Sequence, residues 1–220
     1  MGANPLMAVA IAREMGAGGA VLGQRLARRL RFAYLDRALL RLVAKRAGVT
    51  PAALAHWDEH VSHFWERMAE VLAVGPADAL YTPAPLERGV RDRQLFHLES
   101  QVIREVASRR DLVVIGRGAF WVLRDHPGLV SVRLHAPLAS RIPVVMQTHH
   151  LASADEAREL IEHTDADRAR FISEMTGRAC ESTGCYDLSI NTCQVGLDLA
   201  EEFVARTVEQ VRQRLVHAGA

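Results

Sequence analysis

The chain has 220 residues, of which 49% are hydrophobic and 24% are charged, a balance typical of folded domains rather than of disordered chains. Its formal net charge of +1 does not favour a strongly basic nucleic-acid-binding surface. The longest stretch without a charged residue, 142–154, is shorter than the about 18 residues that a membrane-spanning helix requires. We therefore expect a globular protein that binds neither nucleic acid nor membrane.

Short apolar runs alternate with longer amphipathic stretches along the chain, a pattern that predicts an α/β domain with a parallel sheet. The predicted strands comprise residues 7–11, 32–35, 112–115, 130–134 and 188–190. The predicted helices of the core comprise residues 20–31, 37–47 and 197–216. The run 112–115 is wholly apolar, as expected for a strand that is buried on both faces.

Two stretches between the predicted strands have helical patterns and no strand signal. They lie at about 51–109, where a Pro- and Ala-rich linker at 75–85 separates helical segments, and at about 137–177. We interpret both as helical excursions from a single domain. The sheet core of that domain is predicted to comprise residues 1–50, 110–136 and 178–220.

The N-terminal segment and the cysteines indicate a cytoplasmic protein. The apolar stretch 6–12 has no basic leader and continues into Arg13 and Glu14, which favours a buried strand over a signal peptide. The three cysteines form no CxxC pair, and an odd number is a poor basis for a disulfide framework. These features predict a reducing compartment.

Gly16, Gly18 and Gly19 lie between the first predicted strand and the first helix. Glycines so placed let backbone N–H groups converge on an anion at the helix N-terminus, which favours phosphate binding over a plain tight turn. A dinucleotide-binding fingerprint is an alternative, because Asp36 follows about twenty residues on at the end of a strand. Two details argue against it: its third glycine would fall at Val21, and the spacer before Gly16 is typical of a P-loop.

The loop lacks the two side chains that define a standard P-loop. In the pattern G-x-x-x-x-G-K-[ST], the lysine reaches the β- and γ-phosphates and the hydroxyl binds Mg²⁺. Here Gly18 is followed by Gly19 and Ala20. Of the 27 basic residues, all but Lys45 are arginines, and Lys45 is distant in sequence from the loop. Charge at a phosphate site would therefore come from arginines.

The loop Ala12–Gly23 resembles that of the cytidylate kinase-like family, a divergent branch of the P-loop nucleoside monophosphate kinases. The family's loop is close to S-R-E-x-G-S-G-G-x-x-I-G and likewise has no lysine. Further matches follow in the family's order over nearly the whole chain, at Tyr34–Asp36, Val114–Gly118, His135–Leu138 with Arg141, Thr164–Arg168, Thr176–Gly177 and Tyr186–Thr192. Each motif alone has little specificity, but the ordered set is specific.

The resemblance implies a P-loop NTPase-type parallel sheet flanked by helices, with 51–109 as an acceptor-binding helical insertion and 137–177 as a lid. It implies transfer of the γ-phosphoryl group of ATP, bound with Mg²⁺, to a nucleoside monophosphate, with CMP or dCMP as the leading acceptor. Such a reaction depends on positioning and on neutralising phosphate charge. The implied partners are small-molecule nucleotides, and the oligomeric state stays open.

Matching by position implies roles for individual residues. The ATP phosphates are expected on the backbone of Gly16, Ala17, Gly18 and Gly19. The expected catalytic arginines are Arg13, which would supply the charge of the missing lysine, and Arg141 and Arg168 in the lid. The acceptor is expected at Asp36 and Arg117.

Several positions depart from the family pattern, and they cluster at the expected site. Alanine replaces a polar or basic residue at Ala12, Ala17, Ala20 and Ala166, and Ile115 occupies the place of a Walker B aspartate. No protein ligand for Mg²⁺ remains in the loop, although phosphates and water can hold the ion. A stabilising arginine contributes about 10³- to 10⁵-fold to phosphoryl transfer, so the losses leave a non-catalytic nucleotide-binding regulatory protein as the alternative.

His56, His60 and His63 recur at helical spacing, as the ligands of a metal site on one helix face would. They lie beside charged residues in the helical excursion, where a solvated helix is the commoner arrangement. We therefore predict no metal site.

Overall fold

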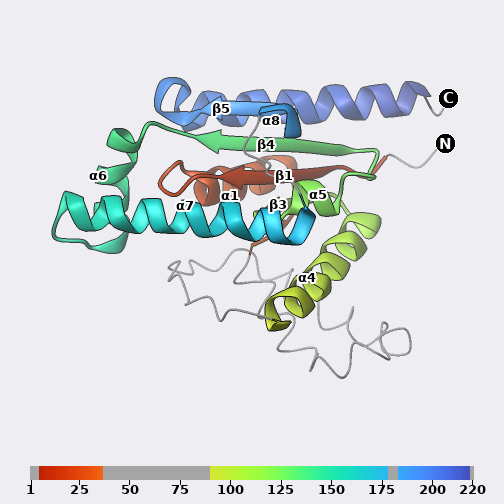
Figure 1. The fold of residues 1–220 in the computed structure, drawn as a ribbon. Coiled ribbons are helices and arrows are strands. Elements are labelled where there is room, and N and C mark those ends of the chain that lie inside the picture. The colour runs from red at the N-terminus through yellow and green to blue at the C-terminus, as the bar shows by residue number, and fades with distance from the viewer. Residues whose placement is uncertain (1–4, 37–89, 178–182, 219–220) are drawn as a thin grey trace.

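The computed structural model describes residues 5–36, 90–177 and 183–218. Its centre is a five-stranded parallel sheet with the strand order β2-β3-β1-β4-β5 (Figure 1). The strands are β1 (Ala8–Arg13), β2 (Ala33–Leu35), β3 (Leu112–Ile115), β4 (Leu129–His135) and β5 (Leu188–Asn191). All five predicted strands are confirmed, with ends that differ from the prediction by at most two residues.

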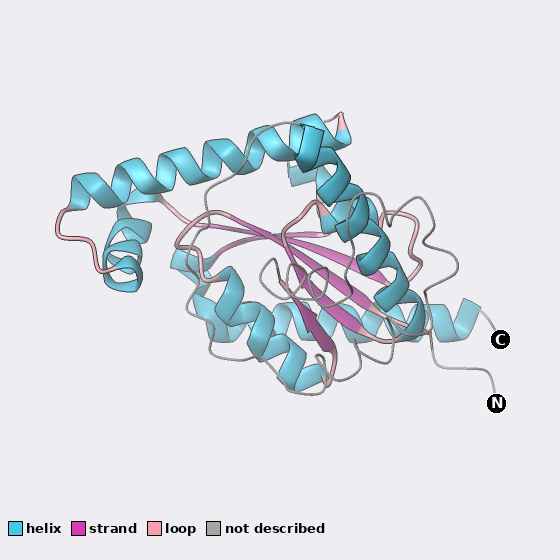
Figure 2. Cartoon of the chain, turned by 90° about the horizontal axis from the view of Figure 1, so that it is seen from below, coloured by secondary structure: helices cyan, strands magenta, loops and turns pink. Residues whose placement is uncertain are grey.

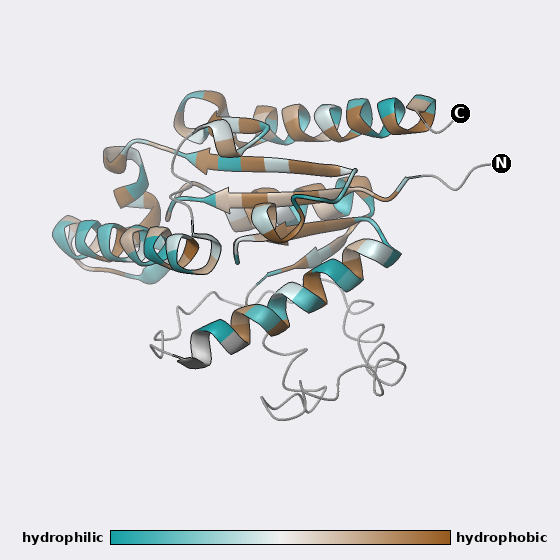
Figure 3. Ribbon diagram, turned by 45° about the vertical axis from the view of Figure 1, so that its right-hand side comes forward, coloured by the Kyte–Doolittle hydropathy of each residue, from teal (hydrophilic) through white to brown (hydrophobic). Residues whose placement is uncertain are grey.

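Helices cover both faces of the sheet (Figure 2). On one face, α1 (Gly19–Leu30) and α8 (Thr192–Ala218) pack on alternate residues of β1, β3 and β4. On the other face, α4 (Val90–Arg109) and α5 (Ala119–Val122) pack on the intervening residues. A strand covered on both faces has no solvated side, and every residue of β3 is accordingly buried. Figure 3 shows that the strands of the sheet are coloured mostly as hydrophobic.

The central strand β1 brings the loop that follows it to the carboxyl edge of the sheet. Residues Ala8–Ile11 pair with Leu112–Ile115 of β3, and Ala8–Arg13 pair with Leu129–Leu134 of β4. Because the strands are all parallel, the segments that follow them meet at one edge, which is where ligands bind in open α/β sheets.

Two helices, α6 (Leu138–His149) and α7 (Ala154–Thr176), form the second predicted helical excursion (Figure 1). Ser153 begins α7, because its Oγ accepts the N–H of Glu156 at 3.1 Å. A small hydrophobic cluster joins the pair to the loop after β1; its buried members are Met15, Ile142, Val145, Ala157 and Ile161. The pair is therefore fixed against the glycine loop as well as against itself.

The C-terminal helix has an interruption that explains where its predicted pattern begins. Gly196 has φ 75° and ψ 159°, which are not helical, so a short turn from Thr192 precedes the continuous helix. The prediction of a helix from 197 is confirmed for that continuous part. A side chain at Gly196 would be strained by the positive φ.

Several predicted features lie outside the described residues. They are the helix at 37–47 with Lys45, most of the first helical excursion including its linker at 75–85, and the histidines His56, His60 and His63. Of that excursion, α4 is described. In the described part of the chain, none of the helices is both long enough and apolar enough to span a membrane.

Candidate functional site

The loop between β1 and α1 forms a turn of backbone N–H groups at the start of a helix. Gly16 has φ 81°, and Gly18, which precedes α1, has φ 78°; both lie in the left-handed region that favours glycine. No described side chain caps the N-terminus of α1. Its first amides therefore keep the donor capacity and the positive end of the helix dipole with which such loops bind phosphates.

Gly16 is pressed against the first helix of the α6–α7 pair. A Cβ added there would lie 3.0 Å from the Cβ of Arg141 and 3.0 Å from Cγ2 of Val145. A side chain at this position would therefore push α6 away from the loop. The backbone conformation and the close approach both require glycine.

The Arg13 side chain crosses the loop and fills the space that a side chain at Gly19 would occupy. A Cβ added to Gly19 would lie 2.6 Å from Arg13 Cγ, and one added to Gly116, just after β3, would overlap Arg13 Nη1. The arginine stem thus lies on Gly19, and its guanidinium reaches the carboxyl end of β3. In a standard P-loop the residue after the second glycine is the lysine, and Gly19 occupies that position here.

Both backbone polar groups of Met15 are bound by the α6–α7 pair. Its N–H donates to Asp165 Oδ1 at 2.8 Å, and its C=O accepts from Arg141 Nη1 at 3.1 Å. Arg141 Nη1 also donates to Asp165 Oδ2 at 2.6 Å, which closes a ring of hydrogen bonds. The loop, α6 and α7 therefore meet at one carboxylate.

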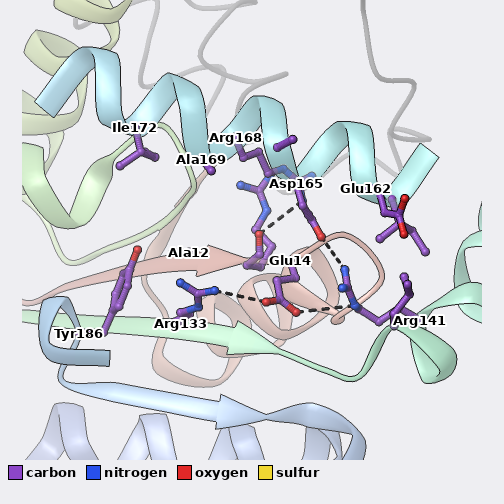
Figure 4. A pocket seen from close by; sticks show the side chains of 14 residues that line it. Ala12, Glu14, Arg133, Arg141, Glu162, Asp165, Arg168, Ala169, Ile172 and Tyr186 are labelled. Carbon is purple, nitrogen blue, oxygen red and sulfur yellow. Dashed lines mark hydrogen bonds and ion pairs between the residues drawn. The ribbon is translucent and has the colours of Figure 1, made fainter. Parts of the chain in front are cut away.

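Three further ion pairs, Arg133–Glu14, Arg141–Glu14 and Arg168–Asp165, extend this ring along the carboxyl edge (Figure 4). Arg168 Nη1 lies 3.3 Å from Asp165 Oδ1 and 3.4 Å from the Arg13 carbonyl oxygen, so α7 contacts the end of β1. Glu14 accepts from the Ala136 N–H at 3.2 Å and pairs with Arg133 Nη2 at 3.3 Å. Arginines and carboxylates thus alternate across the edge.

A cavity of about 430 Å³ lies in the midst of these groups. Four arginines and three carboxylates line it: Arg13, Arg133, Arg141, Arg168, Glu14, Glu162 and Asp165. Apolar side chains, among them Ile172 and Tyr186, form the rest of its wall. An arginine-rich pocket beside a glycine loop is the setting in which a phosphorylated ligand is bound by charge-assisted hydrogen bonds.

Arg117 follows β3 and lies in a buried ion pair. Its Nε and Nη2 both lie 2.5 Å from Glu99 Oε2, and its guanidinium stacks 4.1 Å from the centre of the Phe171 ring. The two side chains are only 9% and 2% exposed. Arg117 adopts φ 55°, so this unusual backbone and the pairing together fix the direction of the guanidinium. It is not among the described residues that line the cavity.

Asp36 directly follows β2, where it is half-buried near Tyr34. Burial raises the pKa of the Tyr34 hydroxyl, the neighbouring Asp36 carboxylate raises this pKa further, and Arg13 lowers it. The Tyr34 hydroxyl therefore lies in the fields of both Asp36 and Arg13. These three side chains connect the end of β2 to the glycine loop.

Among the described residues, no group of three His, Cys, Asp or Glu side chains is arranged to hold a metal ion. Ala20 and Ile115 stand where a P-loop kinase carries its hydroxyl and its Walker B carboxylate. Phosphates and water can hold a Mg²⁺ ion that enters with ATP.

The structure brings together three predicted arginines, Arg13, Arg141 and Arg168, around one cavity beside the predicted loop residues. It places the predicted acceptor residues, Asp36 and Arg117, at the ends of β2 and β3. Sequence reasoning gave no role to the carboxylates that pair with these arginines, namely Glu14, Glu99 and Asp165, nor to Arg133. For Asp165 a local signal was present, because it lies three residues before Arg168 on one helix.

The chain is similar to known proteins in sequence and in structure. The model of the cytidylate kinase-like family matches residues 8–194. An uncharacterized protein from Eubacterium ventriosum has a similar structure, with a TM-score of 0.68 and 18% identity over 92% of this chain and 98% of that one. A gluconokinase from Sinorhizobium meliloti aligns with a TM-score of 0.50 and 13% identity over 99% of both chains. No curated protein matches the sequence.

The likeness to the Eubacterium ventriosum protein extends over nearly the whole of both chains and shows a shared fold. The predicted fold class, a P-loop NTPase-type parallel sheet flanked by helices, is confirmed. The family match includes the glycine loop, the end of β3 and both helices of the α6–α7 pair. The residues that line the cavity therefore all fall within the matched segment.

Proposed function

The chain belongs to the cytidylate kinase-like family, and from this premise we propose that it transfers the γ-phosphoryl group of ATP to a nucleoside monophosphate. CMP or dCMP is the leading acceptor. Phosphoryl transfer requires the protein to position two phosphorylated ligands and to neutralise charge, with little covalent chemistry of its own. The cavity and the glycine loop supply arginines and backbone donors for that purpose.

The observation that carries the proposal is the position of Arg13 on Gly19. A P-loop kinase without its lysine needs another cation at the β- and γ-phosphates. The Arg13 stem occupies the space of a side chain at Gly19, and its guanidinium lies between the glycine loop and the end of β3. Arginine binds phosphate through two parallel N–H bonds, so it is a competent replacement for lysine.

The remaining predicted residues take roles around this cation. The ATP phosphates lie on the backbone of Gly16, Ala17, Gly18 and Gly19, and Arg141 and Arg168 clamp the transferring group from the lid formed by α6 and α7. The acceptor binds at Asp36 and Arg117. Glu99 engages Nε and Nη2 of Arg117, which directs Nη1 toward the acceptor phosphate in this proposal.

The test is an acceptor panel with Mg²⁺-ATP, in which ADP formation is measured for CMP, dCMP, UMP, AMP and GMP. Gluconate serves as an acceptor from outside the nucleotides, since the gluconokinase has a similar fold. We expect turnover with a pyrimidine monophosphate and none with gluconate. Folded protein that turns over no member of the panel would contradict the proposal.

A second candidate is a nucleotide-binding regulatory protein without catalysis. It is favoured by one observation, the presence of Ala20 and Ile115 at the two positions that hold Mg²⁺ in a standard P-loop kinase. This candidate predicts binding of ATP by calorimetry together with no ADP formation for any acceptor. Both candidates keep the expectations of a cytoplasmic location and of small-molecule nucleotides as partners.

The dinucleotide-binding alternative is disfavoured by the order of the strands. In the dinucleotide-binding fold β1 pairs with β2. Here β1 lies between β3 and β4, and the described strand β2 is at the edge, beside β3. Stabilisation of the protein by NAD(P) and not by ATP would restore that alternative.

A further inference from the structure

Resting on the proposed phosphate site, we propose that the Asp165 carboxylate is an internal substitute for a phosphoryl group. It occupies the donors that a nucleotide phosphate needs, and the nucleotide has to displace it. The free protein is thus held in a self-occupied state by its own lid. When a ligand binds, its phosphate takes the place of the Asp165 carboxylate at the junction of the loop, α6 and α7.

The donors around Asp165 are of the kinds that bind phosphate. One is a backbone N–H of the glycine loop, that of Met15 at 2.8 Å, and the others are guanidinium nitrogens, Arg141 Nη1 at 2.6 Å and Arg168 Nη1 at 3.3 Å. Loop amides and arginines are the ligands of transferring phosphoryl groups in kinases. The two carboxylate oxygens of Asp165 therefore accept from the same donors that could bind two oxygens of a phosphate.

The surrounding groups have capacity for a larger anion than a carboxylate. Arg141 is 9% exposed, and its buried Nε makes no hydrogen bond with any described residue. The carboxylate oxygen that pairs with that nitrogen, Glu14 Oε2, is 3.7 Å away, beyond hydrogen-bond distance. A buried donor without an acceptor is costly, and a phosphate with three terminal oxygens would satisfy it. The cavity of about 430 Å³ lies directly beside these groups.

A second role for Asp165 makes the opposite prediction. If the carboxylate only orients Arg141 and Arg168 for the ligand, its neutralisation loosens both arginines and weakens phosphate binding. If it competes with the ligand, its neutralisation frees the donors and strengthens binding. The sign of the change in affinity therefore separates the two roles.

The experiment compares Asp165→Asn with Glu162→Gln in the full chain. Glu162 lies one turn earlier on α7 and lines the same cavity, and it forms no ion pair within the described residues (Figure 4). Both variants remove one negative charge from the cavity, so the long-range effect on an anion is shared. The difference between them reports on the contacts that Asp165 alone makes.

Binding of inorganic tripolyphosphate and of Mg²⁺-ATP is measured by calorimetry. We expect Asp165→Asn to bind tripolyphosphate at least about tenfold more tightly than Glu162→Gln, because a competing charge-assisted anion is lost. Equal or weaker binding by Asp165→Asn would overturn the proposal, and so would a failure of both variants to bind. The readout needs no turnover, so it is independent of the acceptor panel.

Thermal denaturation of the same variants separates a change in ligand binding from a loss of stability. Asp165→Ser is included as a second neutral substitution. Both Asp165 variants should unfold at a lower temperature than the wild type when free, since ion pairs are lost. Both should gain more stability than the wild type when tripolyphosphate is added. A smaller ligand-induced gain in both would show a purely structural role and would contradict the proposal.

Discussion

Two groups of arginine–carboxylate pairs in this molecule have similar chemistry and different surroundings. On the outside, Arg25 and Arg29 of α1 pair with Asp198, Glu201 and Glu202 of α8 at distances between 2.5 and 3.7 Å. At the carboxyl edge, the cavity arginines pair with Glu14 and Asp165. The outer pairs join helices that a shared hydrophobic core already fixes.

The comparison teaches that pairing alone does not reveal what an arginine does. Solvent-exposed pairs are screened by water and contribute little, because ordering two long side chains offsets the attraction. The edge pairs are partly buried, lie beside a phosphate-type loop and join the lid to it. Only the second group is placed where a bound anion would compete with the carboxylates. Substitutions that treat the two groups alike should therefore give very different results.

The largest difference is expected between Arg13→Ala and Arg25→Ala. Arg13→Ala removes the cation proposed for the donor phosphates and should lower kcat by about 10³-fold or more with the best acceptor. Arg25→Ala removes the two ion pairs that join Arg25 of α1 to Asp198 and Glu201 of α8, away from the cavity, and should leave kcat unchanged. The measurement is steady-state ADP formation for both variants beside their melting temperatures. Equal rates would refute the role of Arg13.

A large effect on stability is expected where an ion pair is buried. Arg117→Met leaves the carboxylate of Glu99, whose side chain is 2% exposed, without its guanidinium. Breaking a buried pair in this way should lower the free energy of unfolding by about 3–5 kcal/mol, measured by urea denaturation. The matched control is Arg109→Met, which breaks an exposed pair with Glu105 on the same helix as Glu99.

The double variant Glu99→Gln/Arg117→Met sharpens the interpretation of that loss. Removing both charges takes away the pair without leaving a buried carboxylate, so much of the lost stability should return. A double variant as unstable as Arg117→Met alone would show that packing against Phe171, at 4.1 Å, is the larger contribution.

A smaller effect tests the contact between Arg13 and Gly19 directly. Gly19→Ala places a methyl group 2.6 Å from Arg13 Cγ, and such overpacking should cost about 1–3 kcal/mol in the free energy of unfolding. In the Arg13→Ala background the same substitution should cost much less, because the overlapping stem is absent. A double-mutant cycle measured by denaturation checks this. Additive costs would mean that the arginine stem does not lie on Gly19.

Local patterns were sufficient to predict the strands and the glycine loop. The run 112–115 is apolar throughout because β3 is covered on both faces. The loop glycines Gly16 and Gly18 lie where the backbone has a positive φ. Helical spacing predicted the last helix from 197, and the structure places the non-helical Gly196 directly before that continuous part. Each of these features depends on neighbours within a few residues, which is what a single sequence records.

The partners of the arginines were not predictable, because they depend on contacts between distant parts of the chain. Asp165 lies 150 residues from Met15, whose N–H it accepts, and Arg117, which follows β3, reaches Glu99 on α4. The sequence indicates that arginines must replace a lysine, and it does not record which carboxylates hold them in the free protein. That arrangement follows from the docking of α6 and α7 on the loop.

The smallest effect is expected at the outer pairs, where it should appear only in acid. Two hydrogen bonds, the one from Arg29 having the larger effect and the one from Arg206 the smaller, lower the pKa of Glu202 below its ordinary value of 4.5. A carboxyl group whose pKa is lower in the folded state contributes stability that is complete above the unfolded pKa and is lost as pH falls through the folded pKa. The melting temperature of Glu202→Gln should therefore lie slightly below that of the wild type near about pH 7, and the two should converge as the pH falls below about 4. A difference in melting temperature that persists in acid would mean that Glu202 stabilises the α1–α8 contact by packing rather than by charge. The contrast between outer and edge pairs would then not be one of electrostatics alone.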